Sequence, residues 1–217
     1  MQENTLKNIN IKGQTPNLEL LSNAWKEMRG QWGISIGFHL LLILMLMASG
    51  CLYVLQFLII WPLLLGNCRF WLNISRRTNP EISDLFSGFS TYGTILGASM
   101  LVTLICYGGL ILLIIPGIYW GLSYSMVYYI IADNPNVGIN ESLVLSRKMM
   151  YGHKWKLFFF WLASQGIILV SFFLTCGIGS LWVFPWVSVA YAKFYDDIKE
   201  PIEDIQQTPA AQKNISN

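Results

Sequence analysis

The segment RKMMYGHKWK, residues 147–156, contains the side chains best suited to bind a ligand. Its cationic and imidazole groups are Arg147, Lys148, His153, Lys154 and Lys156. Cations beside aromatic residues are typical of a membrane interface, where each cation near an anionic lipid surface contributes about 1 kcal/mol. We therefore expect Arg147, Lys148, His153 and Lys154 to contact anionic lipid or a partner, with Trp155 as an interfacial anchor. A simpler interpretation is that these charges only orient the chain in a membrane.

Enzymatic and metal-binding patterns have little support. His39 and His153 lie far apart in the sequence, and no CxxC, HExxH or phosphate-binding glycine loop occurs. His153 lies in a basic stretch, where a nucleophilic triad is not expected. We expect no catalytic residue, no metal and no cofactor, so the sequence favours a protein that is not an enzyme.

Two cations and three cysteines lie in apolar surroundings and allow more than one interpretation. Arg69 and Lys193 either extend to the membrane interface or line a polar pocket. Cys51, Cys106 and Cys176 are expected on the same, outer side, where an oxidising compartment would let two of them pair. Equally, each cysteine can act as a small apolar residue.

The distribution of charge predicts a membrane protein. Hydrophobic residues make up 54% of the 217 residues and charged residues 12%, and the mean hydropathy is +0.48; soluble domains carry about 25% charged residues. Residues 30–68, 85–132 and 157–192 contain no Lys, Arg, Asp or Glu. Each stretch is roughly twice the length of about 20 residues that one membrane-spanning helix needs. The pattern therefore predicts three pairs of spans joined by uncharged turns.

The expected fold is an all-α integral membrane protein with six transmembrane helices in three hairpins. The spans are expected at residues 33–50, 53–74, 92–108, 110–131, 156–174 and 179–196, with turns at 49–51, 107–109 and 175–179. All Lys and Arg residues lie at or beyond one end of the hairpins, which predicts a protein of the cytoplasmic membrane with both termini inside. Residues 16–198 are expected to form a single membrane domain, with flexible segments at 1–15 and 199–217. Three re-entrant hairpins are the alternative, but lipid-exposed backbone without internal hydrogen bonds disfavours them.

A threefold internal repeat is suggested by short amphipathic segments before each hairpin. These segments are 17–32, 83–92 and 138–150. In the second, Leu85, Phe86, Phe89 and Tyr92 are expected on one apolar face. Helices of this kind lie in the headgroup plane, with Trp25 and Trp32 as further anchors. The second span of each hairpin contains a proline, Pro62, Pro116 or Pro185, and each is expected to bend its helix.

Several motifs resemble a bacterial integral-membrane family known as domain of unknown function 975. They are DLFSGF at 84–89, ADNP at 132–135, GHKW at 152–155 and GIGSLW at 177–182. The resemblance implies a multi-span protein of the bacterial cell membrane, and it extends distantly to the membrane domain of some glycerophosphodiester phosphodiesterases. Lys156 departs from the family pattern, in which an acidic residue is more expected. No catalytic residue carries over from the resemblance.

Two functions from different classes agree with these features. The first is a non-catalytic membrane scaffold that binds anionic lipid, an amphipathic peptide or a partner protein at the cytoplasmic interface. The second is a component of a transporter or exporter for a small molecule, lipid or peptide, in which helices interrupted by proline enclose a path. The few polar residues in the predicted spans favour the first. Nucleic acid is not an expected partner, and no oligomeric state is predicted.

Overall fold

The structure is a computed structural model that describes residues 15–49, 53–112 and 114–199. Within these ranges the chain is helical and has no β-strand. The elements are α1 (Asn17–Glu27), α2 (Trp32–Ser49), α3 (Tyr53–Ser75), η2 (Ile82–Thr91), α4 (Tyr92–Leu112), α5 (Ile114–Tyr124), α6 (Val127–Asp133), α7 (Ile139–Met149), α8 (Lys154–Leu174) and α9 (Ser180–Ile198). The all-α class is thus confirmed.

Five of the six expected spans correspond to single helices, and one does not. The expected span at 110–131 is divided into α5 and α6 by a turn at Ser125 and Met126. At this turn, the Ser123 hydroxyl donates to Tyr119 O at 2.7 Å and the Ser125 hydroxyl to Leu122 O at 2.8 Å. Hydroxyl groups that bond to the preceding turn bend helices, which accounts for the break.

The turn expected at residues 107–109 is wrong, because α4 continues through them to Leu112. The glycines there serve close packing instead. A Cβ on Gly109 would lie 2.6 Å from the Trp120 ring and 3.0 Å from the Cα of Gly117. Small residues at such positions let two helices approach closely, as α4 and α5 do.

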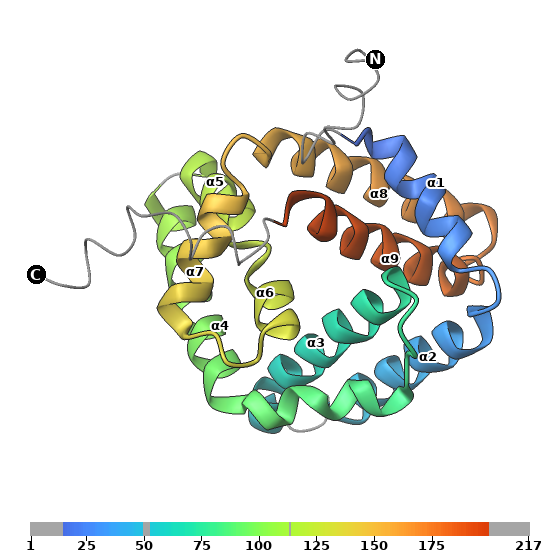
Figure 1. Ribbon diagram of the computed structural model, residues 1–217, viewed down its shortest axis with the longest axis horizontal. Coiled ribbons are helices and arrows are strands. Elements are labelled where there is room, and N and C mark those ends of the chain that lie inside the picture. Colours follow the sequence, from blue (N-terminus) through green and yellow to red (C-terminus); the bar gives the residue numbers. More distant parts are fainter. Residues whose placement is uncertain (1–14, 50–52, 113, 200–217) are drawn as a thin grey trace, which may run out of the picture.

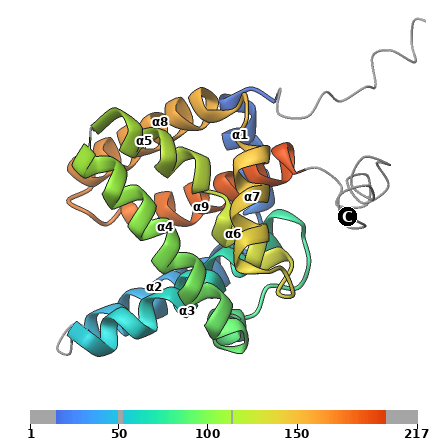
Figure 2. The ribbon, with the colours of Figure 1, turned by 90° about the vertical axis from the view of Figure 1, so that its left-hand side faces the viewer.

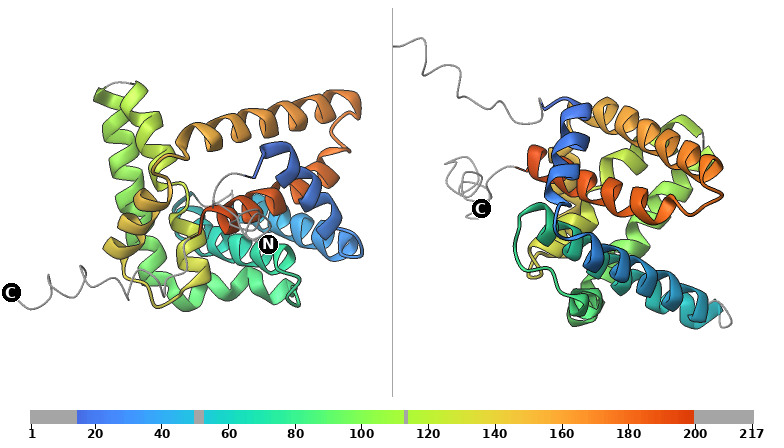
Figure 3. Two further views of the ribbon diagram at one scale, coloured as in Figure 1. Left: turned by 45° about the horizontal axis from the view of Figure 1, so that its top comes forward. Right: turned by 90° about the vertical axis from the view of Figure 1, so that its right-hand side faces the viewer.

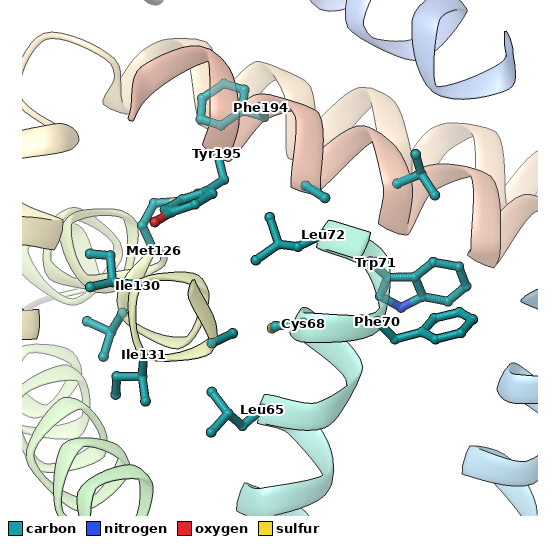
Figure 4. Packing of buried hydrophobic residues seen from close by; sticks show 14 of the residues in the cluster. Leu65, Cys68, Phe70, Trp71, Leu72, Met126, Ile130, Ile131, Phe194 and Tyr195 are labelled. Carbon is teal, nitrogen blue, oxygen red and sulfur yellow. The ribbon is translucent and has the colours of Figure 1, made fainter. Parts of the chain in front are cut away.

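Three helices occupy the middle of the molecule and the others surround them. Figure 1 shows α3, α6 and α9 inside a ring formed by the remaining helices. The buried core comes largely from these three, as Figure 4 shows for Leu65, Cys68 and Leu72 of α3, Ile131 of α6 and Tyr195 of α9. The Tyr129 and Tyr195 rings stack with centroids 5.5 Å apart and join α6 to α9.

Each short amphipathic segment packs on the second helix of a different hairpin. η2 packs on α3, α7 packs on α5 and α6, and α1 packs on α9, so the last of these contacts joins the two ends of the chain. Figures 1 and 3 show α1 lying across α9. In Figure 2, α1, α7 and the C-terminal end of α9 lie on one side, while the far ends of the three helical hairpins lie on the other.

The second amphipathic segment is a 3-10 helix, and its buried face differs from the expected one. Leu85 and Gly88, three residues apart, face the protein, whereas Phe86 and Phe89 are 49% and 43% exposed. A 3-10 helix aligns residues i and i+3, which explains the change of face. Gly88 lies against the Pro62 carbonyl, and Gly66 of α3 lies against the Leu85 carbonyl.

Two helical segments of the described chain are long and apolar enough to cross a membrane, namely Ile82–Gly109 and Lys154–Leu174. The bent pair Asn17–Glu27 and Trp32–Met47, with 102° between its parts, becomes a third if it is counted as one span. The structure is therefore compatible with a membrane protein.

Candidate functional site

The last turn of α7 presents two cations beside α5. Arg147 and Lys148 are exposed, and cations at a helix C-terminus interact favourably with the helix dipole. The opposite face of α7 is buried through Ser142, Leu143 and Ser146. The Ser146 hydroxyl donates to Ser123 O at 2.9 Å, which fixes α7 against the C-terminal end of α5.

A sharp turn brings a third cation to the same place. Gly152 has a φ of +83°, a left-handed conformation that favours glycine, and it joins α7 to α8. Lys154 begins α8, and its Nζ lies 3.3 Å from the centre of the Tyr119 ring of α5. This distance is that of a cation–π contact, which ties α8 to α5.

Two adjoining cavities lie between α5, α7 and α8. The first has a volume of about 530 Å³ and an apolar lining that includes Ile118, Tyr119, Leu122, Tyr151, Trp155 and Phe158. The second has a volume of about 640 Å³, and its lining includes Ser123, Val144, Arg147 and Lys148. Both are lined by Tyr119, Tyr151 and Lys154, so they form one groove. We call the second cavity the basic mouth and the first the apolar chamber.

No acidic group among the described residues neutralises the cations of the basic mouth. Within the described part of the chain, Arg147, Lys148 and Lys154 form no ion pair with a carboxylate. The acidic side chains at the ends of α1, α6 and α9 pair with other cations. Positive charge in a partly apolar groove attracts an anion, because the lower dielectric strengthens the interaction.

A separate ionic network joins the ends of the three inner helices. Arg76, just after α3, pairs with Asp133 of α6 at 2.5 Å and with Asp196 of α9 at 2.6 Å. Lys199 also pairs with Asp133. Burial alone would raise the pKa of the Asp133 carboxyl, but the hydrogen bonds and charges of Arg76 and Lys199 hold it below its usual range.

A second ion-pair group involves α1. Glu27 pairs with Arg77 and, at 3.1 Å, with Lys193 of α9. Burial would raise the pKa of the Glu27 carboxyl, but Arg77 and Lys193 lower it below its usual range. Lys193 thus contacts another helix, and Lys156 likewise pairs with Asp197 at 2.7 Å.

Arg69 also points toward a neighbouring helix. Its Nε–H donates to Ala132 O at 3.2 Å, in the last turn of α6, where a cation is favoured. Its Nη2 is buried and has no hydrogen-bond partner among the described residues.

Four of the seven expected contact residues line the groove, and the other three do not. Arg147, Lys148, Lys154 and Trp155 line the groove, whereas His153 is not part of either lining. Trp25 and Trp32 lie elsewhere, with ring centroids 5.1 Å apart, and Trp25 is 5.6 Å from Trp186 of α9.

The prolines also differ in their positions. Pro62 lies inside α3 and Pro185 inside α9. Pro116 lies in the first turn of α5, where proline removes no intrahelical hydrogen bond.

The cysteines and Ser35 have side chains that can act as nucleophiles. Cys106 of α4 and Cys176, in the turn between α8 and α9, are free thiols, while Cys51 lies outside the described residues. The sequence GISIG, residues 33–37, has the spacing of a nucleophile elbow. Ser35 is nevertheless buried inside α2, and its hydroxyl lies 3.8 Å from Met28 Sδ, so it lacks the exposed strand-to-helix turn of that motif.

The α5 wall of the groove was missed by sequence reasoning. Ile118, Tyr119 and Leu122 belong to an apolar segment without a charged residue. The one available signal was the spacing of Tyr119, Leu122 and Ser123, which places them on one helical face.

Fold and groove together define an all-helical protein with helices apolar enough to cross a membrane. A family model described as "Protein of unknown function (DUF975)" matches residues 98–201, a range that includes all residues named here as lining the groove. Over this range the chain is similar to the family that its motifs predicted. Neither the curated proteins nor the solved structures gave a match.

Proposed function

We propose that this is a non-catalytic membrane protein that binds anionic lipid in the groove between α5, α7 and α8. One observation carries the proposal: three cations without carboxylate partners in the described chain line a mouth that continues into an apolar chamber. A lipid phosphate would satisfy the cations, and the chamber would accept apolar groups next to it. Trp155, which lines the groove and is 73% exposed, suits the headgroup level of a membrane.

The membrane arrangement that suits this function has six spans in three units, each made of an amphipathic segment and a hairpin. Support comes from the circular packing, in which η2, α7 and α1 each contact the second helix of another hairpin. In this arrangement the basic mouth and both termini face the cytoplasm of a cell whose inner leaflet is anionic.

Reporter fusions test this topology. We expect a reporter fused after residue 79, 137 or 205 to lie inside the cell, because cations favour the cytoplasmic side. A reporter fused after residue 51, 113 or 177 should lie outside. A mixed pattern would contradict the six-span arrangement.

Lipid retention tests the proposed function. The double variant Arg147→Gln/Lys148→Gln should retain about 10-fold to 30-fold less phosphatidylglycerol than the wild type, because each cation contributes about 1 kcal/mol. The measurement is native mass spectrometry of protein purified in lipid nanodiscs that contain phosphatidylglycerol and phosphatidylcholine. Retention of phosphatidylcholine should not change.

A charge-matched control is the double variant Lys26→Gln/Arg29→Gln, which removes two exposed cations near the end of α1. These residues do not line the groove, so retention should stay within about twofold of the wild type. Equal losses in the two double variants would indicate that net charge, rather than the groove, attracts the lipid.

A further inference from the structure

The apolar chamber is continuous with the basic mouth but has a different lining. Its walls are hydrophobic and aromatic side chains of α5 and the start of α8, and Lys154 is the one cation among the described residues that line it. Tyr119, Tyr151 and Lys154 line both cavities. A headgroup bound to Arg147 and Lys148 therefore has an apolar space directly beside it.

The volume of the chamber indicates what it can hold. At about 30 Å³ for a group of methylene or water size, a chamber of about 530 Å³ holds roughly 18 such groups. This corresponds to one acyl chain of common length. Two chains would need roughly twice the volume. A free phosphate would bind the cations but would leave the apolar chamber unfilled.

We propose that the apolar chamber binds one acyl chain of an anionic glycerophospholipid whose phosphate lies in the basic mouth. This inference rests on the proposed function and specifies its ligand. The second chain of a diacyl lipid stays outside the chamber, and a lysophospholipid fits completely. Lys154 lies at the boundary, where its contact with Tyr119 places a cation beside both the phosphate and the first carbons of the chain.

Selection by chain length follows from the limited volume of the chamber. A chain that leaves a bilayer or a detergent micelle gains little from apolar surroundings, because it was already in them. The mouth therefore determines whether a phosphate-bearing lipid binds, and the chamber determines which chain fits. The wall residue Ile118 is 48% exposed, so a larger side chain there can fill the chamber without disturbing the buried core.

The test uses the full chain in detergent and lysophosphatidylglycerols with chains of about 8 to about 22 carbons. Glycerol phosphate serves as the probe without a chain. In native mass spectrometry, wild-type retention should rise about tenfold from the shortest chain to chains of roughly 16–18 carbons, because a longer chain makes more van der Waals contacts with the lining, and should not rise beyond them. Glycerol phosphate should be retained no better than the shortest chain.

Two variants and a control locate the effect. Ile118→Trp should abolish the rise with chain length and leave retention of the shortest probe within twofold. In Phe158→Ala the rise should continue to longer chains, because the substitution enlarges the chamber. Leu104→Trp, at a 71% exposed position on α4, should behave as the wild type.

The outcomes separate this inference from the proposed function. If Ile118→Trp keeps the full rise with chain length, or if glycerol phosphate is retained as well as the best long-chain probe, the chamber is not an acyl-chain site. If Arg147→Gln/Lys148→Gln leaves retention of the shortest probe unchanged, the basic mouth does not bind the phosphate and the proposed function fails as well.

Discussion

Replacing Gly88 with alanine is expected to lower the free energy of unfolding by about 2–3 kcal/mol, the range for overpacking a tight contact. The melting temperature in detergent should fall by about 5–10 °C. A Cβ at Gly88 would overlap the backbone carbonyl of Pro62, which cannot move away as a flexible side chain could. Gly66→Ala should have a similar effect, because its Cβ would meet the Leu85 carbonyl.

Gly93→Ala is the matched control in the first turn of α4. Nothing lies within 4 Å of a Cβ at Gly93, so the melting temperature should stay the same or rise slightly. Thermal unfolding followed by intrinsic tryptophan fluorescence gives the comparison. Equal melting temperatures for Gly88→Ala and Gly93→Ala would contradict the close packing of η2 on α3.

Arg76→Gln is expected to cost about 2–3 kcal/mol of stability at neutral pH. Among the described cations, the change leaves Asp133 with Lys199 alone and removes the main partner of Asp196. The Asp133 side chain is only 11% exposed. Arg77→Gln is the matched control at the next residue. Its side chain is 68% exposed, so this loss should be below about 1 kcal/mol.

The pH dependence of the melting temperature provides a second test of the ion pairs around Asp133. The pKa of Asp133 in the folded protein lies below the ordinary 3.8, so its ion pairs stabilise the fold above that pH and are lost as the pH falls through the folded value. The difference in melting temperature between the wild type and Asp133→Asn should therefore be largest at neutral pH and should shrink below about pH 4. A difference that does not depend on pH would show that the Asp133 charge does not stabilise the fold.

Much of the helical layout follows from the sequence. The charge-free stretches predicted α8 and α9 within a few residues, because a long apolar run must satisfy its backbone internally. The role of Gly109 could not be predicted in this way. A glycine is compatible with a turn and with close helix contact, and only the position of Trp120 and Gly117 decides between them.

Half of the groove could be predicted and half could not. Composition alone singled out Arg147, Lys148 and Lys154, since cations next to aromatic residues are unusual in so apolar a chain. Tyr119 became part of the site only through packing of α5 against α7 and α8. An apolar residue in a predicted span has no local feature that separates a cavity wall from a core position.

The ionic network shows the same limit over larger separations. Arg76 lies 57 residues from Asp133 and 120 residues from Asp196 in the sequence. Their partnership depends on the arrangement of α3, α6 and α9 in Figure 1, which no spacing rule predicts. Taken singly, each of these charged residues is compatible with an exposed position at the end of a span.

The most direct measurement of the central claim is the position at which a bound anionic lipid attaches to the chain. Phosphatidylglycerol with a photoreactive group beside its phosphate is incorporated with the wild-type protein into nanodiscs, and the cross-linked peptides are mapped by mass spectrometry. We predict labels concentrated in residues 119–123 and 144–154, and their loss in Arg147→Gln/Lys148→Gln. The contrary result is labelling near Lys26 and Arg29, at the end of α1, that is as strong as labelling of the groove and unchanged in that variant. It would contradict a lipid-binding groove.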